Sequence, residues 1–142
     1  MADATPPPPP SLHQLVEHAP VGMLVVDRDH RVVVWNSFMA LHSGRAAEEV
    51  LGRNLYERFP ELPRSFLHKK IESVFLLRHP SFTAWEQRPY LFPFPHNRPI
   101  TGGVDYMRQS CTFQPIPDEA GTVNHVGITL FDMTDASLYQ EQ

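Results

Sequence analysis

The stretch VGMLVVDRDHRVVVWN, residues 21–36, holds two apolar runs on either side of a polar turn. Two short valine-rich runs that flank such a turn predict an antiparallel β-hairpin. If one face of the hairpin were wet, apolar and polar side chains would alternate. Here Met23, Val25 and Val33 stand where polar residues would be expected. The sequence therefore predicts a sheet that is covered on both faces.

Length, charge and cysteine content describe one acidic domain. The 142 residues are enough for one hydrophobic core. The net charge of -4 and the scattered Lys and Arg side chains argue against a nucleic-acid-binding surface. The single cysteine, Cys111, is typical of a reducing compartment, so we expect a cytoplasmic protein. Since no apolar stretch approaches the roughly 20 residues of a bilayer span, we expect no direct membrane insertion by this segment.

A proline-rich start and a short amphipathic helix precede the hairpin. Residues 1–10 contain five consecutive prolines, which favour a disordered tail. Ser11 can cap a helix over residues 11–19, and Pro20 ends it. We expect this helix to cover the outer face of the hairpin, alone or with a second copy of the chain, and to be the dimerisation element. Its apolar face consists of Leu12, Leu15, Val16 and Ala19.

Helical patterns follow the hairpin, and strand patterns follow the helices. Capping residues and glycine or proline stops predict short helices at residues 37–43, 46–51 and 54–59. The one long helix is predicted from Arg64 to His79, with an apolar face of Leu67, Ile71, Val74 and Phe75. Period-two patterns predict strands at residues 82–85, 106–116 and 126–130. Residues 88–103 form an aromatic, proline-rich connection that excludes a central strand.

Several weak motifs, in this order, resemble the PAS family of sensory domains. They are the hairpin with Asp27 and the capping Asn36, the segment AAEEVLGRNLYERFP at residues 46–60, the last hairpin within residues 114–135, and its Asp-x-Thr pattern of Asp132 and Thr134. The resemblance implies an α+β PAS fold with a five-stranded antiparallel sheet, short helices and one long helix across one face. It places the PAS domain at residues 20–135 and the start of a linker to an output domain at 136–142.

Two features depart from the family pattern. His30 stands in the first turn where glycine is usual, and residues 89–99 enlarge a connection that is often a short hairpin. The first departure suggests a turn that is longer or differently wound. The second leaves open whether the aromatic side chains close over a ligand or fill their own gap against the sheet.

The resemblance implies a pocket between the sheet and the long helix, where family members bind haem, flavin, small carboxylates or nothing. Residues 52–63 lack the cysteine of the flavin photoreceptors, so flavin is disfavoured. Haem held by His68 or His79 stays an alternative, and the cofactor is not identified. The pocket candidates are Leu67, His68, Ile71, Phe75, Tyr90, Phe92, Met107, Gln109, Cys111 and Phe113.

The residue patterns favour neither a metal centre nor catalysis. The eight histidines include no H-x-E pairing and no two histidines four residues apart on a helix, and the single cysteine forms no C-x-x-C. Ser43 does not stand in a G-x-S-x-G elbow. We therefore expect no metal site and no enzymatic activity in this domain.

With the resemblance, these observations predict a sensory input domain of a bacterial signalling protein. A small ligand or partner would change the packing of the sheet, and the change would leave through Asp132 and Thr134 towards an output domain. The expected output is a histidine kinase or a diguanylate cyclase, and the enlarged aromatic segment favours the cyclase. Two alternatives stay open: a haem-based gas or redox sensor, and a ligand-free interaction and dimerisation module.

Overall fold

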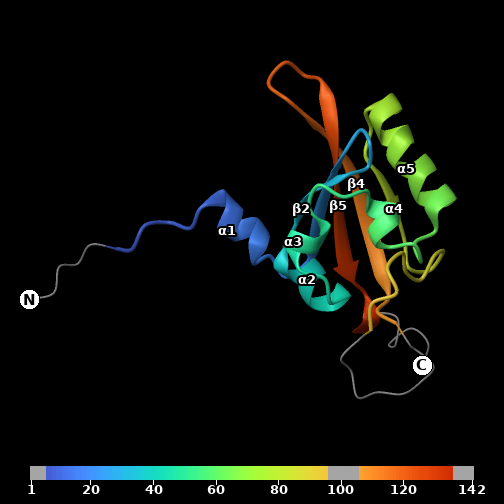
Figure 1. The fold of residues 1–142 in the computed structure, drawn as a ribbon, viewed down its shortest axis with the longest axis horizontal. Coiled ribbons are helices and arrows are strands. Elements are labelled where there is room, and N and C mark those ends of the chain that lie inside the picture. Colours follow the sequence, from blue (N-terminus) through green and yellow to red (C-terminus); the bar gives the residue numbers. More distant parts are fainter. Residues whose placement is uncertain (1–5, 96–105, 136–142) are drawn as a thin grey trace, which may run out of the picture.

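The computed structural model describes residues 6–95 and 106–135. The helices and strands follow the predicted order (Figure 1). The predicted linker, residues 136–142, and the second half of the aromatic connection lie outside the described residues. The elements are α1 Leu12–Glu17, β1 Gly22–Asp27, β2 Val32–Trp35, α2 Ser37–Ser43, α3 Ala47–Val50, α4 Leu55–Arg58, α5 Arg64–Leu77, β3 Ser81–Thr83, β4 Gln109–Pro117 and β5 Val123–Asp132.

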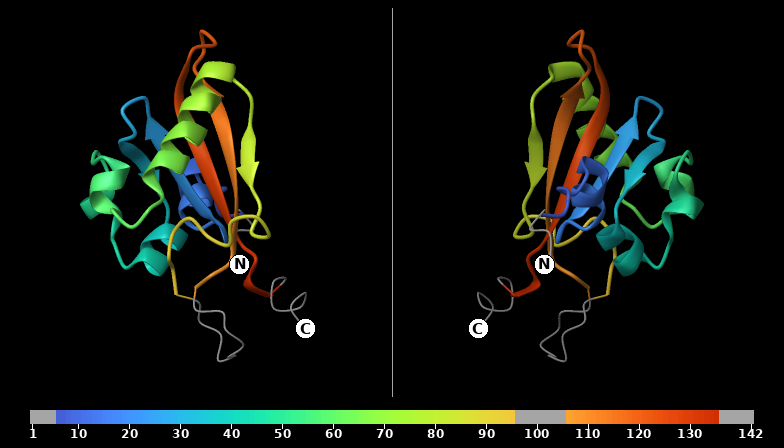
Figure 2. Two further views of the ribbon diagram at one scale, coloured as in Figure 1. Left: turned by 90° about the vertical axis from the view of Figure 1, so that its right-hand side faces the viewer. Right: turned by 90° about the vertical axis from the view of Figure 1, so that its left-hand side faces the viewer.

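Five strands form one antiparallel sheet in the order β2-β1-β5-β4-β3, which confirms the predicted fold class. The first hairpin lies beside the last strand, because β1 pairs with both β2 and β5. Leu24 is opposite Trp35 on one side and Ile128 on the other. Figure 2 shows α5 across one face of the sheet and α1 at the opposite face. Among the described residues, no helix has the length and apolar character that crossing a membrane requires.

The turn of the first hairpin is closed by Asp27 and His30. The Asp27 carboxylate accepts hydrogen bonds from the backbone N–H groups of Asp29 and Arg31, at 2.9 and 3.0 Å. This is the turn chemistry expected of aspartate. His30 has a φ of 61°, a left-handed conformation that glycine adopts at lower cost. The departure from glycine therefore leaves the turn tight and puts an imidazole at its end.

α5 carries the predicted apolar face but ends earlier than predicted. Leu67, Ile71, Val74 and Phe75 are all buried against the sheet. The helix ends at Leu77 because Arg78 turns into the left-handed region, with φ of 59°, and its N–H donates to the Val74 carbonyl. His79 therefore lies beyond the helix.

The strands differ from the prediction at their ends. β4 begins at Gln109 and not at Tyr106, because the backbone N–H of Met107 bonds the Phe94 carbonyl instead of a strand partner. β4 tolerates Pro115 and Pro117 because β3 pairs only with residues 111–113, which leaves this edge free of ladder bonds. β5 begins at Val123, three residues before the predicted start.

α1 lies at the outer face of the sheet, as predicted, but does not cover it alone. None of the residues of this described helix is buried, and Leu12 and Leu15 are 81% and 55% exposed. Val33 on β2 is 41% exposed. Of the two predicted alternatives, the helix alone does not cover the outer face, and cover together with a second copy stays a prediction.

The reason is that α1 is short and fixed at one end. The Asn36 side chain donates to the Val16 carbonyl at 3.0 Å, and the Ser37 hydroxyl donates to the Glu17 carbonyl. A helix of six residues is only about 9 Å long. Held at its C-terminal end, it projects away from the outer face of the sheet instead of lying along it (Figure 1).

Candidate functional site

The chain's own aromatic segment packs into the hydrophobic core. Leu91, Phe92 and Phe94 are buried at 1 to 3% exposure. The Phe92 ring lies 5.7 Å from that of Phe59 and 6.3 Å from that of Trp35, both in edge-on contacts. Such contacts are favourable beyond the area they bury. The aromatic segment thus forms part of the core.

Gln109 fixes this segment through its buried side-chain amide. Its Oε1 accepts hydrogen bonds from the backbone N–H groups of Leu91 and Phe92, both at 3.1 Å. Its Nε2 donates to the Phe92 carbonyl at 2.7 Å. One side chain thus satisfies two buried N–H groups and shares the Phe92 carbonyl with the Phe94 N–H, which meets the hydrogen-bond needs of a buried loop. Gln109 thus holds the aromatic segment in place.

The structure divides the predicted pocket residues into two groups. Most are buried together in the core: Leu67, Ile71, Phe75, Phe92, Met107, Gln109, Cys111 and Phe113. Tyr90 is half-buried with its ring 5.1 Å from that of Tyr106. His68 is exposed on α5. The two candidate haem ligands, His68 and His79, both lie outside the core.

Cys111 behaves as a buried apolar residue. Burial raises the pKa of its thiol to about 12, and the hydrogen bond with the Thr83 side chain lowers it only in part. The thiol is therefore protonated at neutral pH and is a poor nucleophile.

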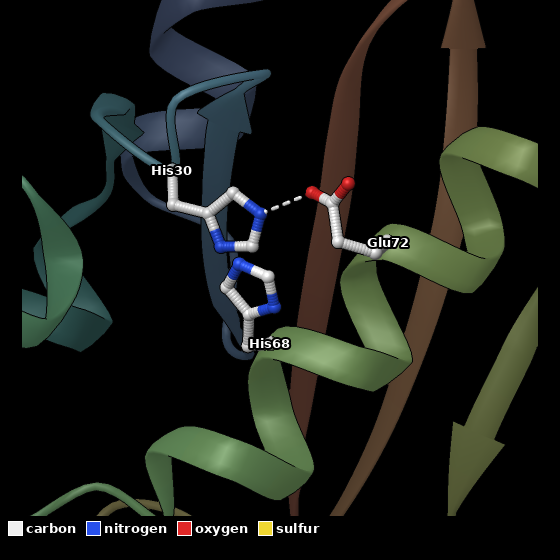
Figure 3. Close-up of side chains that lie close together, drawn as sticks. All are labelled: His30, His68 and Glu72. Atoms are coloured by element: carbon white, nitrogen blue, oxygen red, sulfur yellow. Dashed lines mark hydrogen bonds and ion pairs between the residues drawn. The ribbon is translucent and has the colours of Figure 1, made fainter.

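A polar cluster joins the first turn to α5 (Figure 3). His30 Nε2 lies 2.6 Å from Glu72 Oε2, and His30 Nδ1 lies 2.6 Å from the Tyr56 hydroxyl. The rings of His30 and His68 stack with centroids 4.7 Å apart. His30 is 3% exposed, whereas His68 and Glu72 are open to solvent. Burial raises the pKa of Tyr56, so its hydroxyl keeps its proton.

Sequence reasoning missed this cluster because it looked for H-x-E pairs and for two histidines four residues apart, and not for a histidine and a glutamate at that spacing. His68 and Glu72 are four residues apart on α5, so both lie on one face of the helix. The third member comes from a turn 38 residues before His68, and only the fold brings it there. The available signal was the histidine at a turn position where glycine is usual.

The outer face of the sheet carries an apolar groove of about 240 Å³. It is a hollow over the central strands, and Val16 of α1 borders it. The remaining lining residues come from β1, β2, β4 and β5: Met23, Leu24, Val25, Val34, Gln114, Ile116, Gly127, Ile128 and Thr129. Gly127 deepens the groove, because a Cβ there would stand 3.0 Å from the Ile116 side chain.

The predicted exit residues form a closed turn at the end of β5. The Asp132 carboxylate accepts hydrogen bonds from the Thr134 backbone N–H at 3.0 Å and from the Thr134 hydroxyl at 2.6 Å. The Arg108 backbone N–H donates to the Thr134 hydroxyl at 3.1 Å. Thr134 is fully buried. The exit turn is thus bonded to the residue next to Gln109.

Comparisons with known proteins agree with this architecture. A family model described as the PAS fold matches residues 11–112. A sensory box sensor histidine kinase from Vibrio cholerae is 29% identical, with a TM-score of 0.64 over 85% of this chain and 88% of that one. Histidine kinase ThkA, solved in complex with response regulator protein TrrA, is 25% identical, with a TM-score of 0.64 over 90% of this chain and 33% of that one.

The PAS domain of Bordetella pertussis BvgS is 21% identical and shares the fold, with a TM-score of 0.65 over 92% of this chain and 90% of that one. No curated protein matches the chain. The family match begins just before α1, spans the first hairpin and α5, and ends within β4. The sheet has the five antiparallel strands that the resemblance implies. The chain therefore belongs to the PAS family.

Proposed function

We propose that this chain is the input domain of a histidine-kinase signalling protein and works as a dimerising interaction module with a packed interior. The contrast between the two faces of the sheet carries the proposal. The chain's own aromatic residues fill the α5 side, whereas the outer side has an open apolar groove beside exposed leucines. Of the functions predicted from the sequence, this is the ligand-free alternative.

Two similar structures support a kinase output. The Vibrio cholerae protein and ThkA are both named as histidine kinases, at 29% and 25% identity. We therefore prefer a kinase to the cyclase that the aromatic segment favoured in the sequence. In this proposal the domain is regulatory, has no catalytic role of its own, and lies in the cytoplasm, the compartment that its single cysteine favours.

A second copy of the chain is the partner that suits the outer face. A two-fold interface uses the same patch on both copies, so the patch needs both a projection and a hollow. Here α1 supplies the projection, with Leu12 and Leu15 exposed, and the groove next to it supplies the hollow. A dimer that seats α1 of one copy on the groove of the other buries both and covers the outer face.

Hydrogen bonds connect this interface to the core and to the exit. Asn36 bonds the Val16 carbonyl of α1, and its Oδ1 accepts from the Met23 backbone N–H at 3.0 Å on β1. At the exit, the Thr134 hydroxyl accepts a hydrogen bond from the Arg108 N–H. The next residue, Gln109, holds the aromatic segment. In this proposal, a shift of α1 changes the sheet packing and so the geometry at residues 132–134.

Replacing Leu15 with glutamate should weaken self-association at least about tenfold, because it puts a charge at the centre of an apolar contact. Sedimentation equilibrium of the whole chain measures this change as an increase in the dimer dissociation constant. Leu76→Glu is the matched control. Leu76 is also an exposed helical leucine, 80% accessible, but lies on α5 across the sheet.

We expect a dimer for the wild type and for Leu76→Glu. A wild-type chain that sediments as a monomer at high concentration would overturn the proposal. So would a dimer that Leu76→Glu breaks and Leu15→Glu leaves intact. Circular dichroism of both variants shows that the fold itself is kept.

A further inference from the structure

The geometry points to a binding site for a zinc-class divalent metal ion, formed by His30, His68 and Glu72, and we propose it as a second site, separate from the outer groove. One potential ligand atom from each of the three side chains lies within 4.8 Å of the others. Two of the side chains come from α5 and the third from the turn between β1 and β2 (Figure 3). A bound ion would therefore tie the first hairpin to the long helix.

His30 has a left-handed backbone conformation that glycine would adopt at lower cost. Its backbone is left-handed, which costs a non-glycine residue about 1 kcal/mol or more, and its imidazole is 3% exposed. A glycine would close the same turn without either cost. The backbone is fixed on both sides, because the His30 N–H donates to the Asp27 carbonyl and the His30 carbonyl accepts from Leu55 N–H. The imidazole is thus presented to α5 as a rigid group.

Two imidazoles and one carboxylate are a ligand set typical of zinc sites with three protein ligands and one open position. Tetrahedral zinc with bonds of about 2.0–2.2 Å keeps its ligand atoms about 3.4 Å apart. To reach this geometry, the distance between His30 Nε2 and Glu72 Oε2 must increase from 2.6 Å. The longer distances between ligand atoms of the cluster, which are at most 4.8 Å, must decrease. His68 and Glu72 are exposed, so rotation of their side chains can supply both movements. The fourth position then faces solvent.

Tyr56 supplies the hydrogen bond behind the buried ligand. Without a metal ion, His30 Nε2–H donates to Glu72 and the Tyr56 hydroxyl donates to Nδ1, a tautomer assigned from the hydrogen bonds. With an ion on Nε2, the ring proton moves to Nδ1 and donates to the Tyr56 oxygen. A hydroxyl both donates and accepts, so the 2.6 Å contact serves both states. Such a bond orients a metal-binding histidine and increases its basicity.

Zinc titration of the whole chain, first stripped with a chelator, tests the site by calorimetry and thermal unfolding. We expect one ion per chain and a rise in Tm of about 8 °C when free zinc reaches a hundred times the dissociation constant. Magnesium at the same concentrations should leave Tm unchanged, because it prefers oxygen ligands. An equal shift with magnesium would overturn the proposal.

His68→Phe and Glu72→Gln are the informative variants, because both residues are exposed and both changes remove a ligand atom but keep a planar group in place. His68→Phe also keeps a ring to stack on His30. Each should weaken zinc binding at least tenfold. His79→Ala is the control, since His79 is an exposed histidine beyond the end of α5 and outside the cluster. No zinc binding by the wild type, or binding that both variants leave unchanged, would contradict the site.

Discussion

Replacing Gln109 with leucine should lower the free energy of unfolding by at least about 3 kcal/mol. The change introduces an apolar side chain of similar volume and removes all three hydrogen bonds to the backbone of Leu91 and Phe92. The N–H groups of Leu91 and Phe92 are left without a partner, whereas the Phe92 carbonyl still accepts from the Phe94 N–H. Each buried backbone group left without a partner costs about 1–3 kcal/mol. Urea denaturation of the whole chain measures the loss.

Gln87→Leu is the matched control, because Gln87 is exposed in the turn that precedes the aromatic segment. It should change stability by less than about 0.5 kcal/mol. Amide hydrogen exchange gives a second readout: the N–H groups of Leu91 and Phe92 should exchange much faster in Gln109→Leu. If those amides stayed protected and stability fell by less than 1 kcal/mol, the role given to Gln109 would be wrong.

Replacing Phe92 with alanine should lower the free energy of unfolding by about 3–5 kcal/mol, the usual range for a fully buried phenylalanine. Phe92 is 1% exposed and contacts the rings of Trp35, Phe59 and Phe94. The substitution also leaves an apolar cavity in the interior that the wild type fills. Small aromatic molecules such as benzene should therefore raise the Tm of the variant and not that of the wild type.

Phe82→Ala controls for the loss of a phenylalanine in general, because Phe82 on β3 is 68% exposed. It should cost far less than Phe92→Ala, and it should not create a benzene site. A wild-type chain that benzene stabilises as strongly as Phe92→Ala would show that the interior already has room for a ligand. That result would favour the small-ligand function over the packed module.

The elements that local patterns specify were predicted well. The apolar runs of the first hairpin and the 3.6-residue period of α5 are properties of neighbouring residues, so both appear in the structure close to their predicted positions. The last strands were predicted correctly as strands, but their predicted first and last residues were wrong. Residues 106–108 do not join β4 because one of their N–H groups bonds Phe94, a contact that no periodicity shows.

The candidate sites depended more on contacts between distant segments. Asn36 was predicted as a helix cap, and its Oδ1 does accept from the Met39 N–H at 3.3 Å. Its second role, the bond to α1, required the fold. Likewise, the sequence left open whether the aromatic segment is a lid or a filler. Gln109 settles the placement of residues 91 and 92, since its amide bonds their backbone inside the core.

The cluster of His30, His68 and Glu72 shows a different limit. Metal motifs are recognised from sequence when their ligands follow a fixed spacing, as in paired histidines one helical turn apart. Here a turn and a helix each contribute part of the cluster, so no spacing reveals it. Its one local sign in the sequence was a histidine at a turn position where glycine is usual, a position to which the structure gives a positive φ. Such positions merit inspection as functional candidates.

Native mass spectrometry of freshly purified whole chain tests most directly whether this PAS domain packs its own interior and associates through its outer face. We expect twice the mass of the chain, with no organic molecule bound beyond the polypeptide and metal ions. A monomer, or a dimer that carries a stoichiometric small molecule such as haem or a carboxylate, would contradict the account.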